Sequence, residues 1–140
     1  ELATLPENRH KLTDGKSRVT DAMVSHLENM IDALDEKFTP PSEFVVPGQN
    51  KIAALLDVAR TVVRRAERAT WHAIEAYGTE PAKRGHHNGG INVLSARYLN
   101  RLSDLLFVLA RYANLNHGGD VKWVPAANRR ERPEHPSRTE

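Results

Sequence analysis

The sequence predicts an all-α protein, an up-and-down bundle of long amphipathic helices. Three stretches carry apolar residues at spacings of three and four, as expected for helices with one buried face. Segments rich in proline, glycine and polar residues separate them. No stretch of useful length alternates apolar and polar residues as a half-buried strand would. Three helices alone form a thin core, so the wide apolar faces indicate further helices, from missing sequence or from neighbouring subunits.

The first helix is predicted over residues 17–37, after a polar segment, residues 1–16, that is typical of a loop. Its apolar residues fall on one face: Val19, Met23, Leu27, Met30, Ile31 and Leu34. Pro40 and Pro41 end this pattern, because proline lacks an amide hydrogen and restricts the residue before it. The following loop, residues 38–50, holds a short apolar run, Phe44-Val45-Val46-Pro47-Gly48.

The second helix is predicted over residues 51–77. Asn50 can cap its start through the side-chain oxygen, and Gly78 can close its end. The expected apolar face consists of Ile52, Leu55, Leu56, Ala59, Val62, Val63, Ala66, Ile74 and Tyr77. At about 1.5 Å per residue, such a helix is about 40 Å long.

The third helix is predicted over residues 95–114, with Ser95 as its cap. Its expected core stripe is Tyr98, Leu99, Leu102, Leu105, Leu106, Leu109, Tyr112 and Ala113. A glycine-rich polar loop, residues 78–93, precedes it, and a turn with a short extended run follows over residues 117–126. We therefore expect one helical-bundle domain over residues 1–126 and a disordered tail over residues 127–140, where Pro, Arg and Glu dominate.

Composition excludes several classes of protein. The chain has 140 residues and no cysteine, which removes disulfides, thiolate metal sites and cysteine nucleophiles. The net charge of +2 is too small to indicate nucleic-acid binding. No apolar run approaches the roughly 20 residues needed to span a bilayer, and no signal-peptide pattern opens the chain. We therefore expect a cytoplasmic protein with no membrane partner. Because the first residue is Glu1 rather than Met, we expect a processed protein, an engineered form or a fragment whose beginning is missing.

An arginine row dominates the middle of the second predicted helix. Arg60, Arg64 and Arg68 are four residues apart and share one stripe, with Arg65 and Glu67 between them. Three guanidinium groups in a row repel one another, and Glu67 can neutralise only part of that charge. A solvated face is the common explanation for such a stripe. The use of Arg rather than Lys favours a binding site instead, since the planar fork suits phosphates and carboxylates.

The third predicted helix carries a second polar group. Asn100, Asp104, Phe107 and Arg111 share one side, and Asn and Asp are poor helix formers, so another interaction must favour them there. They are either polar groups bonded to a neighbouring helix, a solvated edge, or a ligand-facing side. His86-His87 lacks further metal ligands at a fixed spacing, so we predict no metal site. Without a phosphate-binding glycine loop, any phosphate chemistry would depend on arginine and helix termini.

Three segments together resemble the PduO-type ATP:cob(I)alamin adenosyltransferases: Phe44–Gly48, Ala59–Arg68 and Tyr98–Ala113. With the helix at 17–37, the resemblance covers residues 17–125. It implies a five-helix bundle that assembles as a homotrimer with active sites at subunit interfaces. It also implies transfer of the 5′-deoxyadenosyl group of ATP to the cobalt of cob(I)alamin, with release of triphosphate. Mg²⁺-ATP and a corrinoid would be the ligands, and a flavin-type reductase would supply cob(I)alamin.

The resemblance assigns an ATP site to matching positions. Arg60 and Arg64 would contact ATP and the leaving triphosphate, Arg65 and Glu67 would complete the polar network, and Asn100 would hydrogen-bond the nucleotide. These roles suit the side chains, because preorganised guanidinium groups stabilise the charge that gathers on a leaving triphosphate.

The resemblance also assigns Phe44 to the corrinoid site, under the corrin ring, where it keeps the lower axial ligand off cobalt. A phenyl ring can fill that face without ligating the metal, because it has no lone pair to offer. Cob(I)alamin is itself a strong nucleophile, so the protein need supply no base and must chiefly position the two substrates and exclude water.

The family normally begins with a segment that wraps the ATP phosphates, followed by two helices, and residues 1–16 do not resemble it. We therefore expect this chain to start near the end of the second family helix. The alternative to an enzyme is a helical corrinoid- or partner-binding module that lacks the ATP loop. A helix that binds nucleic acid is a third reading, disfavoured by the interleaved acidic residues and the small net charge.

Overall fold

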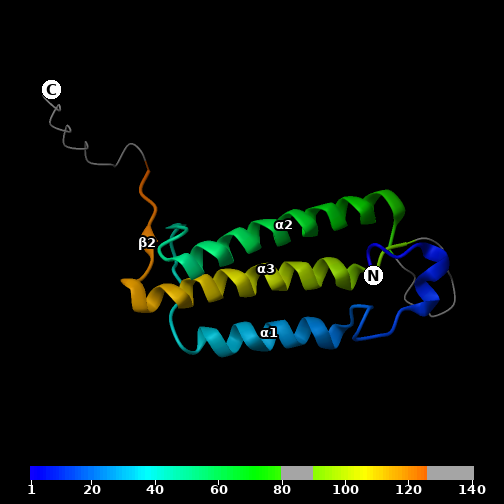
Figure 1. Cartoon of the computed structure of the whole chain (residues 1–140), viewed down its shortest axis with the longest axis horizontal. Coiled ribbons are helices and arrows are strands. Elements are labelled where there is room, and N and C mark those ends of the chain that lie inside the picture. Colours follow the sequence, from blue (N-terminus) through cyan, green and yellow to red (C-terminus); the bar gives the residue numbers. More distant parts are fainter. Residues whose placement is uncertain (80–89, 126–140) are drawn as a thin grey trace, which may run out of the picture.

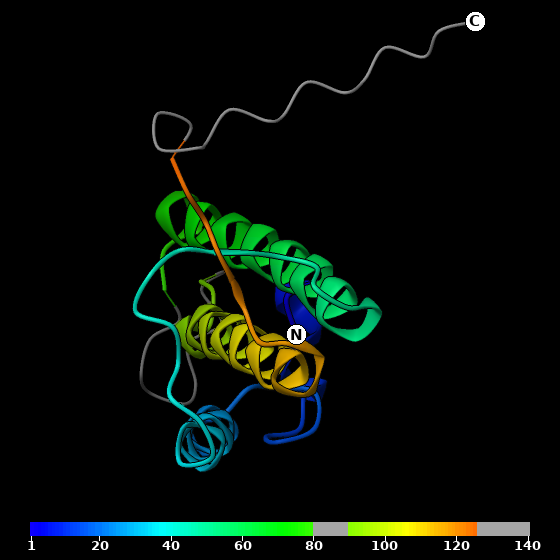
Figure 2. The ribbon, with the colours of Figure 1, turned by 90° about the vertical axis from the view of Figure 1, so that its left-hand side faces the viewer.

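Three long helices lie side by side in a single layer, with the third in the middle (Figures 1 and 2). The computed structural model describes residues 1–79 and 90–125. Its elements are the 3-10 helix η1 (Pro6–Lys11), α1 (Asp21–Asp35), β1 (Val45–Val46), α2 (Lys51–Tyr77), α3 (Val93–Asn114), the 3-10 helix η2 (Leu115–His117) and β2 (Val121–Lys122). This part of the chain is mainly helical, as the sequence predicts, with one small two-stranded sheet.

The helices alternate in direction, as an up-and-down arrangement requires. In Figure 1, α2 runs opposite to both α1 and α3. α3 packs against both neighbours, whereas α1 and α2 do not approach each other closely within the described residues. The three helices thus form an open layer, and each outer helix is packed along one side.

Both ends of α2 agree with the sequence prediction. The Asn50 side-chain oxygen accepts a hydrogen bond from the Ala53 amide at 3.0 Å, as expected of a cap. At the other end Gly78 adopts a φ of 75°, in the left-handed region where glycine carries no steric penalty, and its amide donates to the Ile74 carbonyl at 2.8 Å.

The predicted start of the first helix is wrong by four residues, since α1 begins at Asp21 rather than Ser17. Residues 13–18 form a tight turn instead, in which the amides of Lys16, Ser17 and Arg18 all donate to the Thr13 carbonyl. Gly15 permits this turn with a φ of 74°. The segment that we expected to be a loop also contains η1.

The predicted cap of the third helix is also wrong. α3 begins at Val93, and the Asn92 side chain caps it by accepting from the Leu94 amide at 3.1 Å. Ser95 lies inside the first turn and is buried. Both residue types suit a cap, and Asn92 prevails because it comes one turn earlier and also donates to the Val19 carbonyl at 3.0 Å, which ties the start of α3 to the segment before α1.

The core stripe predicted for the third helix is largely wrong. Of its members only Leu105 is buried, whereas Tyr98, Leu99, Leu102, Leu106, Leu109 and Ala113 are half-buried and Tyr112 is exposed. Three of the most deeply buried positions hold small side chains seven residues apart, Ala96, Ser103 and Ala110, and two others hold polar side chains, Arg111 and Asn114. Small residues at every second turn allow neighbouring helices to approach α3 closely.

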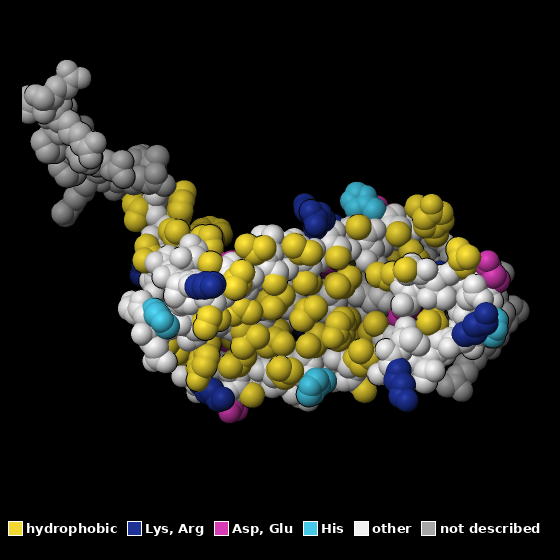
Figure 3. Space-filling model, viewed as in Figure 1, with side chains coloured by type: hydrophobic (Ala, Val, Ile, Leu, Met, Phe, Trp, Pro, Cys, Tyr) yellow, Lys and Arg dark blue, Asp and Glu magenta, His cyan; other side chains and the backbone are white. Residues whose placement is uncertain are grey.

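The predicted apolar face of α2 is likewise only partly packed. Ile52, Leu55, Val62 and Tyr77 are exposed, because α2 has a neighbour on one side only. Together with Val58, the first three form an exposed stripe of four large apolar side chains, here called the outer stripe. Hydrophobic side chains also cover much of the face of the layer seen in Figure 3. Apolar surface of this kind often marks contacts with other protein segments.

Two short strands, β1 before α2 and β2 after α3, pair at one end of the layer. This strand pair and the adjoining ends of α2 and α3 are here called the corner. β1 pairs with β2 antiparallel, with Val45 opposite Lys122 and Val46 opposite Val121. The Trp123 amide extends this pairing by donating to the Phe44 carbonyl at 2.8 Å. The sequence indicated an extended run at 121–124 but not its partner, because a two-residue strand has no periodicity to read.

None of the helices within residues 1–79 and 90–125 combines the length and apolar character that crossing a bilayer requires. The predicted tail, residues 127–140, and the histidine pair His86-His87 lie outside the described residues, so neither prediction is tested.

Candidate functional site

The arginine row of α2 divides into two kinds of side chain. Arg65 and Arg68 lie on the exposed side of the helix, whereas Arg60 and Arg64 are half-buried toward α3. The Arg60 guanidinium carbon lies 5.4 Å from the centre of the Phe107 ring, at cation–π distance. The row is therefore not uniformly solvated, and its two half-buried arginines face the middle helix.

A buried carboxylate joins the row to α3. Glu67 is 5% exposed and accepts a hydrogen bond from Arg64, one turn earlier on the same helix. Its other oxygen accepts from the Asn100 side-chain amide of α3 at 2.9 Å. A charge this deeply buried requires such partners, because an unpaired carboxylate in an apolar setting is costly. Arg64, Glu67 and Asn100, which the sequence predicted to share a site, thus form one connected network.

The network continues along α3 toward solvent. The Asn100 side-chain oxygen accepts from Arg101 at 2.6 Å, and Arg101 also pairs with Asp104 at 3.0 Å. Arg64 and Arg101 therefore flank the Glu67–Asn100 pair from two helices. Each guanidinium keeps part of its surface in solvent, with exposed side-chain fractions of 43% and 39%. Arginines held in this way can still receive an anionic ligand.

A groove of about 400 Å³ adjoins this network, which is large enough for part of a nucleotide. All three helices line it: Val24 and Glu28 of α1, Glu67 and Trp71 of α2, and Arg97, Asn100 and Arg101 of α3. The sequence prediction included only Glu67 and Asn100 of these. Trp71 could have been found, since it lies one turn beyond Glu67 on the same stripe. The residues of α1 gave no signal, because their approach depends on tertiary packing.

Phe44 stands apart from the groove, at the corner formed by the two strands. The residue is 84% exposed, although its side chain is a large apolar ring. Its backbone, in contrast, is held by the Trp123 amide and by the strand that starts at the next residue. An exposed ring on a fixed backbone offers a flat surface to a flat apolar ligand.

Among the described residues, no three His, Asp or Glu side chains converge as metal ligands. The predicted site residues fall into three places. Arg60, Arg64, Glu67 and Asn100 lie between α2 and α3, Phe44 lies at the corner, and Arg65 lies on the solvent side of α2.

Known proteins resemble this chain over most of its length. The family model described as cobalamin adenosyltransferase matches residues 1–113, so the match includes the first 16 residues, which the sequence analysis had left outside the resemblance. The corrinoid adenosyltransferase of Mycobacterium tuberculosis is 46% identical over 112 residues, 80% of this chain and 52% of the relative. The corrinoid adenosyltransferase of Bacillus subtilis is 38% identical over 111 residues, 79% of this chain and 51% of the relative. The chain thus spans about half the length of these curated relatives.

Proposed function

The chain belongs to the cobalamin adenosyltransferase family, and from this membership we propose that it carries part or all of an active site that makes adenosylcobalamin. The reaction is transfer of the 5′-deoxyadenosyl group of ATP to the cobalt of cob(I)alamin. The cobalt donates the electron pair that forms the cobalt–carbon bond. The carbon–oxygen bond to the triphosphate breaks, and the triphosphate leaves with that electron pair.

The observation that carries this proposal is the network of Arg64, Glu67 and Asn100 beside the groove. The buried Glu67 carboxylate holds the Arg64 side chain, and part of the Arg64 guanidinium remains open to solvent. A guanidinium held in place before the reaction stabilises charge on a leaving triphosphate without reorganising first. Asn100, held by the same carboxylate, would bond the nucleotide.

Arg60 would act with Arg64 on the triphosphate, and Arg65 would join them only through a ligand or segment that reaches the solvent side of α2. Mg²⁺ would arrive with ATP. Phosphate oxygens and water would supply most of its ligands, as is usual for Mg²⁺ at nucleotide sites.

Phe44 would lie against the corrin ring. Its exposed phenyl surface supports this assignment, since a buried ring could not contact a corrinoid. Such a ring displaces the lower axial ligand of cobalt without replacing it.

A homotrimer with an active site between subunits belongs to the same proposal, as do a flavin-type reductase and a cytoplasmic location. The outer stripe of α2, Ile52, Leu55, Val58 and Val62, supports association, since four large apolar side chains are costly to leave in water. Two further helices, as in the five-helix family fold, or a neighbouring subunit would cover them.

The test is to incubate the chain with Mg²⁺-ATP and chemically reduced cobalamin and to follow the cobalt absorbance. Formation of adenosylcobalamin with one triphosphate per turnover supports the proposal. Corrinoid binding without turnover would favour the alternative, a binding module that lacks an ATP loop. Failure to bind either ligand would refute both functions.

A further inference from the structure

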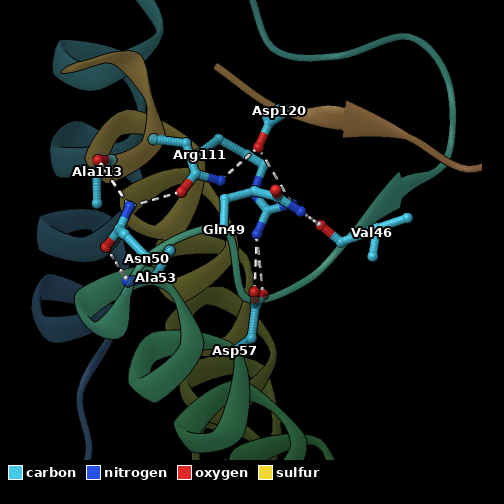
Figure 4. A network of polar contacts seen from close by, with 9 residues as sticks. Val46, Gln49, Asn50, Ala53, Asp57, Arg111, Ala113 and Asp120 are labelled. Atoms are coloured by element: carbon cyan, nitrogen blue, oxygen red, sulfur yellow. Dashed lines mark hydrogen bonds and ion pairs between the residues drawn. The ribbon is translucent and has the colours of Figure 1, made fainter. Parts of the chain in front are cut away.

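A second polar cluster lies beside the strand pair (Figure 4), and none of its residues lines the groove. At its centre is Arg111, in the last turn of α3, which is 1% exposed and is the largest fully buried side chain among the described residues. Arg111 donates to both oxygens of Asp57 of α2, at 2.9 and 3.1 Å. It also pairs with Asp120 at 3.5 Å. One guanidinium therefore fastens α2 and the segment after α3 to the same point.

Both chain segments that lead to the strand pair are fixed by this cluster. Asp120 directly precedes β2 and accepts from the buried Asn114 side chain at 2.6 Å. Asn114 in turn accepts from Asn50 at 2.8 Å, and Asn50 caps the helix that follows β1. Gln49 adds a bond from its side chain to the Val46 carbonyl at 3.0 Å. The cluster thus holds the end of one strand and the start of the other.

We propose that Arg111, Asp57 and Asp120 are positioning residues for Phe44. They fix the start of β2 relative to α2 and α3, and the pairing of β2 with β1 in turn fixes the Phe44 backbone. The link from Asp120 to Phe44 is short, since Trp123, three residues after Asp120, donates its amide to the Phe44 carbonyl at 2.8 Å. The proposal deepens the proposed function, because the position of the ring matters only if Phe44 contacts a corrinoid.

The chemistry of the cluster distinguishes it from ordinary corner packing. A two-residue strand pair is too short to hold its own position in water. The exposed pair between Glu43 and Lys122, at 3.1 Å, adds little because both side chains are in solvent. The buried, charge-assisted bonds of Arg111 are the strong interactions at this corner. The cluster is also linked to the arginine row through the Phe107 ring. The guanidinium carbons of Arg111 and Arg60 lie 5.2 and 5.4 Å from the centre of that ring.

The test uses Asp120→Asn and Asp57→Asn, which keep the size of the side chain and remove one charge. Glu43→Gln is the matched control, because it removes a carboxylate from the same strand pair at the surface. Amide hydrogen exchange is measured at Trp123 and along α3 without any ligand. We expect exchange at Trp123 to accelerate about tenfold or more in both Asp variants and less than about twofold in the control, and by more than exchange in the middle of α3.

The second measurement is binding of cob(II)alamin, which requires no turnover. We expect Asp120→Asn to weaken binding about tenfold in the parent chain and to have no further effect in a Phe44→Ala background, because both changes act through one ring. Unchanged exchange at Trp123 in both Asp variants would overturn the proposal. So would an acceleration in the middle of α3 as large as that at Trp123, or losses of affinity that add in the double variant. If the parent chain binds no corrinoid, the proposed function fails, and the exchange result alone decides whether the cluster positions Phe44.

Discussion

Arg64 and Arg111 each bind carboxylates near the α2–α3 contact, but the two arginines differ in how far their side chains are exposed to solvent. At the centre of the layer the carboxylate of Glu67 is the buried member, and 43% of the Arg64 side chain remains in solvent. At the corner the arginine is the buried member, and Asp57 and Asp120 enclose it. A guanidinium that is fixed but reachable can bind an anion, whereas one that is enclosed can only hold the fold. Burial therefore separates two arginines that sequence alone does not distinguish.

The largest expected effect is on stability, from Arg111→Met. The substitution leaves Asp57 and Asp120 without their cation, and removing one partner of a buried ion pair costs about 3–5 kcal/mol. Urea unfolding followed by circular dichroism measures the free energy of unfolding. Arg68→Met, on the exposed side of α2, is the control and should change it by less than about 0.5 kcal/mol. A loss below 1 kcal/mol for Arg111→Met would remove the contrast between the two arginines.

The next effect is on activity, from Arg64→Ala. We expect adenosyl transfer to fall about 10²–10³-fold, because one preorganised donor to the leaving triphosphate is lost, while the helical circular dichroism stays nearly unchanged. The rate is followed by the cobalt absorbance. Arg64→Lys, which keeps the charge but not the planar fork, should fall between the parent and the alanine variant. Full activity of Arg64→Ala would refute the role assigned to this arginine.

A smaller effect is expected from Asn100→Asp, which replaces a donor to Glu67 with a second carboxylate. The buried Glu67 loses its bond from α3 and gains a like charge, so we expect the free energy of unfolding to fall by about 1–3 kcal/mol. Asp104→Asn, on the same helix but half in solvent, is the control and should have little effect. Equal stability of the two variants would show that the Glu67–Asn100 bond does not join the helices.

The smallest expected effect on stability comes from Phe44→Ala. Because the residue is 84% exposed, removal of its ring should change the free energy of unfolding by less than about 0.5 kcal/mol. The same variant should bind cob(II)alamin more weakly than the parent, by spectroscopic titration. A stability loss above 1 kcal/mol would mean that the ring packs against the protein, and the corner would then serve the fold alone.

Local signals allowed the sequence to predict α2 closely. Asn50 and Gly78 determine its ends through bonds within four residues, which a single sequence can encode. The start of α1 was missed because residues 13–18 form a turn around the Thr13 carbonyl, which the apolar periodicity that begins at Val19 does not show. The leucines of α3 were misplaced because periodicity shows which face of a helix is apolar, not how many neighbours it has.

The candidate site shows the same division. Helix spacing and the family resemblance together brought Arg64, Glu67 and Asn100 into one prediction, and the structure connects them. The cluster around Arg111 was not foreseen as a unit. Asp57, Arg111 and Asp120 belong to three segments, and no spacing rule relates them. Arg111 was assigned only to a polar side of its helix, with its partner left open.

The open layer has a consequence for how a ligand would affect the whole chain. Within the described residues α1 and α2 each pack against α3 and not against each other, yet both line the groove. A molecule bound there would bridge the two outer helices directly, which no close contact among the described residues does. In thermal unfolding, the ligand should therefore raise the midpoint temperature of the entire helical region together. At a ligand concentration a hundredfold above the dissociation constant, the free energy of unfolding should rise by about 2.7 kcal/mol.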